Sequence, residues 1–171
     1  MKVLVVVDMQ KDFIDGSLGS EMAKAIVPNV IDEIRSFDGL VLATMDTHGT
    51  DYLETQEGLN LPVKHCIKGT DGWKLDFEIQ SLIKTIPIEK PTFGSIGLAG
   101  KLMSLSKDEK IESIELVGLC TDICVISNAM VIKAALPETP IYVKASCCAG
   151  VTKESHERAL LAMESCQIKI I

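Results

Sequence analysis

Six short apolar runs, rich in valine and isoleucine, recur along the chain. They cover residues 2–9, 40–46, 85–90, 113–119, 140–146 and 167–171. The apolar positions are continuous rather than alternating, which is typical of strands covered on both faces of a sheet. Between some of these runs lie stretches in which apolar residues recur with helical spacing, at 23–37, 126–136 and 153–166. Strands that alternate with helices predict a single α/β domain over residues 1–171, with a parallel sheet of about six strands.

The helical stretches also predict which side chains face the core. The first places its apolar residues on one stripe: Ile26, Val30, Ile31 and Ile34. The last is expected to bury Leu160, Leu161 and Met163. The stretch 49–80 has few strand signals and many polar residues and glycines, and a loop of that length in a compact domain is usually functional.

Composition and charge narrow the class of protein. The chain has 171 residues, of which 47% are hydrophobic and 24% charged, as in folded globular proteins. A net charge of -7 argues against a nucleic-acid partner, and no apolar run reaches the length of a membrane span. The six cysteines form no CxxC pair and follow no secretion signal, so we expect reduced thiols and a cytoplasmic protein.

Polar residues with chemical potential stand where the predicted strands end. The first strand ends at Asp8, the second at Asp46 with His48 just beyond, the third at Lys90, and the fourth leads to Cys124. Sites in open α/β sheets form outside the carboxyl ends of the strands. We therefore expect an acid, a cation and a thiol to meet at one edge of the sheet.

Cys124 stands at the start of a predicted helix. Backbone N–H groups and the helix dipole favour a thiolate there, and a nearby Lys90 ammonium is expected to lower the pKa of the thiol. Asp8 is placed to take the thiol proton as a general base. Backbone N–H groups of the turn from Cys120 to Cys124 are candidates for an oxyanion hole. The alternative is that Cys124 only fills the core, as buried cysteines often do, in a binding or thiol-redox protein without catalysis.

Five segments carry a resemblance to a known family: "VVVDMQKDF", "DTH", "LPVKHCIKGT", "EKPTFGS" and "VGLCTDICVISNA". In this order they resemble the isochorismatase-like cysteine hydrolases, which include nicotinamidase and N-carbamoylsarcosine amidase. The resemblance implies a three-layer α/β/α fold with a six-stranded, mostly parallel, Rossmann-like sheet. It also implies a catalytic triad of Asp8, Lys90 and Cys124, a cis peptide before Cys120, and an oxyanion hole from the N–H groups of Cys120 and Cys124.

Asp46, His48 and His65 supply a carboxylate and two imidazoles, a set that suits zinc, iron or manganese. By resemblance, nicotinamidases hold a divalent metal with this set, which orients the substrate, and some add a glutamate. Glu57 is the better placed candidate here and Glu54 the fallback. The alternative is that the histidines only hydrogen-bond within a polar loop, as in relatives without a metal. A nucleotide cofactor is not expected, because neither a GxGxxG nor a phosphate-loop motif is present.

The substrate follows from the resemblance less directly. Isochorismatases that cleave a vinyl ether lack the cysteine, so Cys124 favours a small-molecule amide, with nicotinamide as first candidate. Leu61 stands where nicotinamidases commonly carry a tryptophan, and Phe13 and Trp73 are the aromatic candidates for the pocket wall. A carbamoyl or ureido compound and an isochorismatase-type substrate stay open as alternatives. Relatives often assemble, so a homo-oligomer is expected.

Overall fold

The computed structural model describes residues 1–171 and contains one six-stranded parallel sheet. Its strands follow the order β3-β2-β1-β4-β5-β6. Their bounds are β1 (Lys2–Val7), β2 (Leu40–Asp46), β3 (Ile88–Lys90), β4 (Ser113–Leu119), β5 (Ile141–Ala149) and β6 (Lys169–Ile170). Each of the six runs predicted from the sequence therefore overlaps a strand, and β5 continues three residues beyond its run.

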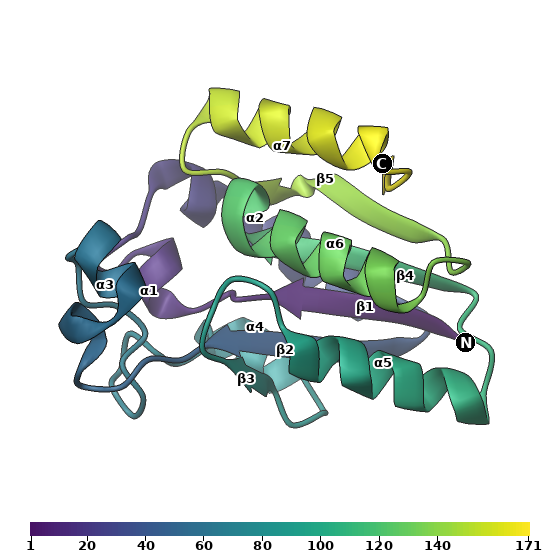
Figure 1. The fold of residues 1–171 in the computed structure, drawn as a ribbon, viewed down its shortest axis with the longest axis horizontal. Helices are drawn as coiled ribbons and strands as arrows, with labels where there is room; N and C mark the ends of the chain where they lie inside the picture. Colours follow the sequence, from purple (N-terminus) through teal and green to yellow (C-terminus); the bar gives the residue numbers. More distant parts are fainter.

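Helices cover both faces of the sheet, which gives the three layers that the resemblance implied. Helix α2 (Glu21–Ser36) and helix α4 (Phe77–Leu82) pack on one face. Helices α5 (Ile96–Asp108), α6 (Ile126–Ala135) and α7 (Lys153–Ser165) lie side by side on the other (Figure 1). None of the helices is both long and apolar enough to cross a membrane.

The central strand β1 shows why its sequence is continuously apolar. Leu4 and Val6 pack into the core under α2, whereas Val3, Val5 and Val7 pack into the core under α5, α6 and α7. Successive side chains of a strand point to opposite faces, so a strand between two helical layers buries every residue. All five of these side chains are fully buried.

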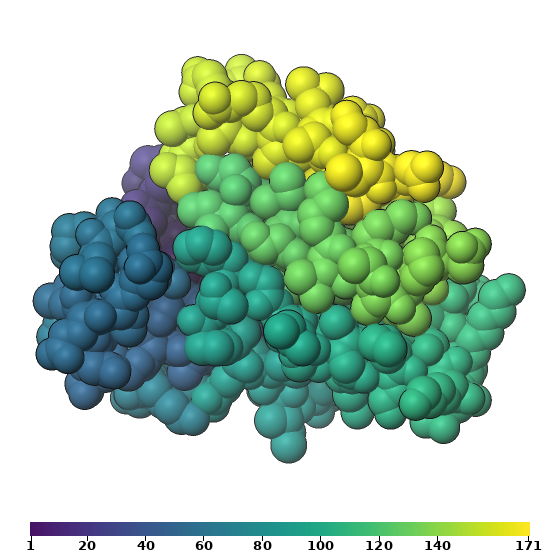
Figure 2. Space-filling view, viewed as in Figure 1, coloured from purple at the N-terminus to yellow at the C-terminus, as the bar shows by residue number.

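The stretch 49–80 is less of a loop than its sequence indicated. It contains the 3-10 helix η1 (Tyr52–Glu54), helix α3 (Gln56–Asn60) and the start of α4. This segment lies at the same end of the molecule as the short helix α1 (Lys11–Ile14), beyond the carboxyl end of β1 (Figure 1). In the space-filling view it forms the blue lobe at the left end (Figure 2).

The predicted core faces are largely confirmed. The four residues expected on the stripe of α2 are buried. On α7, Met163 is buried, but the expectation for Leu161 was wrong, because this side chain is 63% exposed and Ala159 packs instead. Helix α5 was not predicted at all. Its buried Leu98 and Leu102 cover the sheet.

Strand order decides where a site can form. β1 pairs with β2 on one side and with β4 on the other, so the chain reverses its direction of winding at β1. A crevice opens outside the carboxyl ends of the strands at such a switch point. Asp8 and the segment after β4, which carries Cys124, lie at this point.

Candidate active site and metal centre

The backbone around the switch point is unusual at two residues. Asp8 directly follows β1 and adopts φ of 47°, the left-handed region in which a residue with a side chain is strained. Gly118, next to the end of β4, has φ of 118°, and a Cβ there would lie 2.1 Å from the carbonyl oxygen of Val7. Glycine therefore allows β4 to approach β1 closely where the two strands end. The next peptide bond, Leu119–Cys120, is cis, as the resemblance implied.

The three residues predicted at separate strand ends lie together. Nζ of Lys90 lies 2.6 Å from Oδ2 of Asp8 and donates a hydrogen bond to Sγ of Cys124 at 3.5 Å. All three residues are at least 96% buried. An ammonium group thus lies between a carboxylate and a thiol, away from bulk water.

Other groups fix the Lys90 ammonium in this position. It donates a hydrogen bond to the carbonyl oxygen of Thr92 at 3.0 Å and lies 3.4 Å from Oδ1 of Asp46. Burial alone would lower the pKa of Lys90, but the negative charges of the Asp8 and Asp46 carboxylates raise it above its ordinary value. Lys90 lies on β3, the strand at one edge of the sheet. Despite its burial, it therefore stays an ammonium ion.

Asp8 is held in place by a hydroxyl as well as by the lysine. Oγ1 of Thr44, on β2, donates a hydrogen bond to Oδ1 of Asp8 at 2.7 Å. Burial raises the pKa of Asp8 above that of a free aspartate, while Lys90 and Thr44 oppose this change. A carboxylate whose pKa is raised is a stronger base than one in water, which suits proton transfer from a thiol.

The expectation of a thiolate at rest was wrong. Burial raises the pKa of the Cys124 thiol well above its ordinary value, the negative charge of Asp8 raises it further, and the Lys90 ammonium opposes both. The residue lies in a turn of π-helix (Thr121–Val125) that precedes α6. The resting sulfur is therefore a neutral thiol next to a base, rather than a preformed anion.

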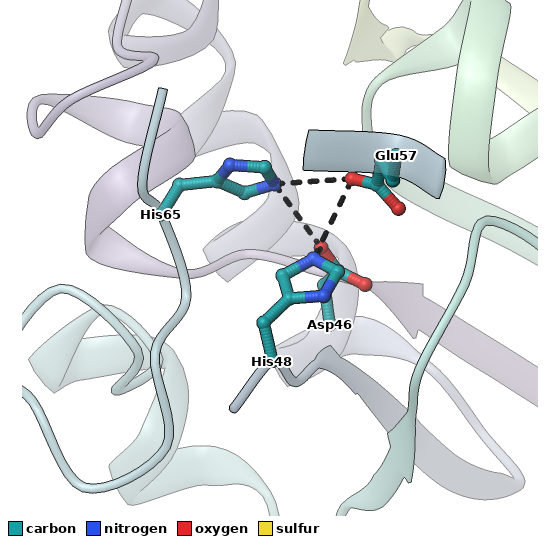
Figure 3. A group of neighbouring side chains, drawn as sticks. All are labelled: Asp46, His48, Glu57 and His65. Atoms are coloured by element: carbon teal, nitrogen blue, oxygen red, sulfur yellow. Dashed lines mark hydrogen bonds and ion pairs between the residues drawn. The ribbon is translucent and has the colours of Figure 1, made fainter. Parts of the chain in front are cut away.

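Four side chains form a second polar cluster beside Lys90. Asp46, His48, Glu57 and His65 bring one potential ligand atom each to within 4.8 Å of one another. Figure 3 shows the two imidazoles and the two carboxylates directed toward a common centre. Nε2 of His65 lies 3.5 Å from both Oδ2 of Asp46 and Oε1 of Glu57. The structure brings together the metal set predicted from the sequence and selects Glu57, since Glu54 is exposed.

The chemistry of this cluster fits a divalent cation. Nδ1 of His65 bonds to the carbonyl oxygen of Val63 at 2.8 Å, which leaves Nε2 to face the centre as a ligand atom. Burial would lower the pKa of His65, but hydrogen bonds with Asp46 and Glu57 raise it to about 10. The buried carboxylate of Asp46 and the half-buried carboxylate of Glu57 thus attract positive charge, which a proton on His65 supplies here and a divalent metal ion would supply more fully.

Glu57 reaches the cluster because α3 packs tightly onto the preceding turn. The side chain of Thr55 caps the helix by accepting a hydrogen bond from the N–H of Gly58. A Cβ on Gly58 would lie 1.9 Å from the carbonyl oxygen of Tyr52, so only glycine permits this contact. The Tyr52 ring in turn packs against His48 and His65, at 4.7 and 5.0 Å between ring centroids.

A cavity of about 330 Å³ opens over both clusters. Cys120 and Cys124 line it on one side, and Asp46, Glu57 and His65 line it on another. Its remaining wall is mostly apolar: Phe13, Leu18, Ala23, Leu61, Phe93, Leu119, Ile123 and Val151. No lysine or arginine lines the cavity. Lys90 contacts Cys124 from behind the cavity wall.

The aromatic wall is only partly as expected. Phe13 and Leu61 line the cavity, whereas Trp73 does not. The indole N–H of Trp73 donates a hydrogen bond to Thr47 at 2.9 Å, and its side chain lines a different pocket together with Met45. Phe93 lines the cavity and was missed, although it stands three residues after Lys90 in the motif "EKPTFGS".

Two buried amides position the site and were also missed. Gln10 clamps the backbone of Asp46: its Nε2 donates to the carbonyl oxygen at 2.8 Å, and its Oε1 accepts from the N–H at 2.7 Å. Asn128 accepts from the N–H of Ser95 and donates to the carbonyl oxygens of Phe93 and Cys124. Both residues stand within the quoted family segments, and their place in those segments was the signal in the sequence that could have identified them.

These features define a class of protein. A doubly wound sheet with an acid, an ammonium ion and a thiol at its switch point fits an α/β enzyme that uses a cysteine nucleophile. A family model, the Isochorismatase domain, matches residues 2–171. The chain belongs to the isochorismatase family and is an isochorismatase-like hydrolase.

Individual relatives agree with this assignment. An uncharacterized isochorismatase family protein, PncA, from Bacillus subtilis (strain 168) is 30% identical over 175 residues, which cover 93% of this chain and 92% of that protein. The pyrazinamidase of Pyrococcus horikoshii, solved in complex with zinc, has a TM-score of 0.81 and 26% identity, covering 99% of this chain and 98% of that one. A nicotinamidase/pyrazinamidase PncA from Bacillus subtilis has a TM-score of 0.80 and 26% identity, with the same coverage.

Proposed function

We propose that the protein hydrolyses a small, uncharged aromatic carboxamide, with nicotinamide as first candidate, through a thioester on Cys124. The observation that carries this proposal is the buried Lys90 ammonium between the Asp8 carboxylate and the Cys124 thiol, behind a cavity that the thiol lines. The similarity to a pyrazinamidase and to a nicotinamidase/pyrazinamidase supports the choice of substrate.

The first half of the reaction forms the thioester. Asp8 takes the proton of the Cys124 thiol as sulfur attacks the carboxamide carbon, and the Lys90 ammonium stabilises the negative charge that develops on sulfur. The carbonyl oxygen becomes an oxyanion, for which the backbone N–H groups of Cys120 and Cys124 are the candidate donors. When the intermediate collapses, the C–N bond breaks, the nitrogen takes the proton from Asp8, and ammonia leaves.

The second half releases the acid. Asp8, again a carboxylate, takes a proton from a water molecule that attacks the thioester carbon. The C–S bond then breaks, the proton returns to sulfur, and the carboxylic acid leaves with the water oxygen. Asp8 thus acts first as base and then as acid in each half, which a carboxyl with a raised pKa can do.

We also propose that a divalent metal ion binds to Asp46, His48, Glu57 and His65. Such an ion, when bound, is a Lewis acid that accepts a ring nitrogen of the substrate. The residues of this chain contribute a rigid, buried frame for it, in which Gln10 fixes the backbone of Asp46 and Tyr52 packs against both imidazoles. The zinc bound by the similar pyrazinamidase supports this assignment.

The cavity wall favours an uncharged amide over the alternative substrates. An N-carbamoyl amino acid or an isochorismatase-type substrate carries at least one carboxylate, and a buried carboxylate needs a cationic partner. The wall has neither lysine nor arginine, and Asp46 and Glu57 repel a second anion unless a metal ion balances them. A neutral aromatic amide has no such requirement.

Ammonia release from nicotinamide, pyrazinamide and N-carbamoylsarcosine tests the proposal. We expect the two aromatic amides to be hydrolysed, and Cys124→Ala to abolish the reaction. Cys166→Ala is the matched control, because this thiol is exposed, stands at the end of α7, and has no contact with the site. Full activity in the Cys124→Ala protein would rule out the thioester, and release of ammonia from N-carbamoylsarcosine alone would rule out the aromatic amide.

A further inference from the structure

The cavity is larger than a single aromatic ring needs. Its volume is about 330 Å³, whereas an engineered protein cavity of about 150 Å³ is sufficient to bind benzene. If the proposed function is correct, the carboxamide lies at Cys124 and the ring nitrogen faces the cluster around His65. A nicotinamide, which adds a carboxamide to the ring, bound in this way leaves part of the space empty.

Part of the apolar wall comes from two segments that carry none of the residues of the two clusters. One is the connection between α1 and α2 with the first turn of α2, which contributes Leu18 and the buried Ala23. The other is the connection between β5 and α7, which contributes Val151. This loop is fixed, because the N–H of Val151 donates a hydrogen bond to Oδ1 of Asp122 at 3.0 Å.

We infer that the substrates of this enzyme are aromatic carboxamides with an uncharged, apolar substituent on the ring, which occupies the space lined by Leu18, Ala23 and Val151. In a nicotinamide, this substituent belongs on C5. That carbon lies opposite C2, the carbon between the amide-bearing atom and the ring nitrogen, so a group on C5 points away from both anchors. The inference rests on the proposed function and narrows its substrate class.

A comparison of nicotinamide with 5-propylnicotinamide tests the inference. An added apolar group that fills an existing hydrophobic pocket commonly raises kcat/KM by about tenfold or more. We therefore expect the wild-type protein to prefer 5-propylnicotinamide by about tenfold. An equal or lower kcat/KM for the propyl compound would overturn the inference, even if nicotinamide is a good substrate.

Variants locate the substituent in the cavity. Ala23→Leu fills the space from a helical position that accepts leucine, and we expect it to reduce the preference for the propyl compound by about tenfold. Leu18→Ala, on a separate segment, removes apolar contact and is expected to reduce the same preference. Leu161→Ala is the control, because Leu161 is exposed on α7 outside the cavity wall. Preferences that do not change in either cavity variant would overturn the assignment of this space.

Binding separates this inference from the proposed function. Titration calorimetry of both amides with Cys124→Ala protein measures how well they fit without any turnover. Tighter binding of 5-propylnicotinamide that is lost in the Ala23→Leu, Cys124→Ala double variant supports the inference, even if no amide is hydrolysed and the proposed reaction fails. Equal binding of the two amides overturns the inference, whatever the rate of hydrolysis.

Discussion

Replacing Asn128 by alanine removes a side chain that joins the nucleophile turn to the segment after β3. Its amide oxygen accepts from the N–H of Ser95 at 2.9 Å, and its Nδ2 donates to the carbonyl oxygens of Cys124 at 2.8 Å and Phe93 at 3.1 Å. Asn128 is fully buried, so water cannot replace these partners without opening the structure. At about 1 kcal/mol for each hydrogen bond, we expect a loss of about 3 kcal/mol in the free energy of unfolding.

The same change is expected to reduce activity. The segment that Asn128 holds contains Thr92, whose carbonyl oxygen accepts a hydrogen bond from the Lys90 ammonium at 3.0 Å. If that segment moves, the ammonium moves relative to sulfur, and a displacement of about 1 Å can lower a rate by about 100-fold. We therefore expect kcat/KM for the hydrolysed amide to decrease by about 10- to 100-fold.

Thermal and urea denaturation, followed by circular dichroism, measure the loss of stability, and the midpoint should decrease by roughly 6–12 °C. Ser127→Ala is the matched control, since Ser127 is the adjacent residue on α6 and its hydroxyl makes no hydrogen bond within the chain. An Asn128→Ala protein whose free energy of unfolding stays within about 0.5 kcal/mol of the wild type, with unchanged kcat/KM, would refute this account of Asn128.

Three further changes test the electrostatics of the site. Thr44→Val removes the hydroxyl that stabilises the charged form of Asp8, so the pKa of Asp8 should increase further and the acidic limb of the pH–rate profile should move to higher pH; an unchanged limb would mean that Asp8 is not the base. Lys90→Met leaves the buried Asp8 without its cation, and we expect loss of activity and of about 3–5 kcal/mol of stability in denaturation experiments. His65→Ala should abolish metal binding in chelator-free protein, measured by elemental analysis, whereas His156→Ala should retain the ion; equal metal content in both variants would contradict the proposed centre.

The sequence contained enough local information to predict the strands and the residues at their ends. A strand between two helical layers is apolar on both faces, and such runs are visible without knowledge of their neighbours. Asp8, Asp46 and Lys90 interrupt the apolar runs at their ends, so their placement at the edge of the sheet also followed from the chain alone. The four potential metal ligands could be proposed because their residue types and order were sufficient.

Only the tertiary structure decided which of these residues meet, how they ionise and what surrounds them. The strand order places β1 between β2 and β4, and this order brings Asp8 to Lys90 and Cys124. Burial depends on neighbours that are distant in the sequence, and it makes Cys124 a neutral thiol, although its position before a helix indicated an anion. The cavity wall also combines distant segments, which is why it excludes Trp73 and includes Phe93. Strand formation depends on local pattern, whereas pKa values and cavities depend on the sum of long-range contacts.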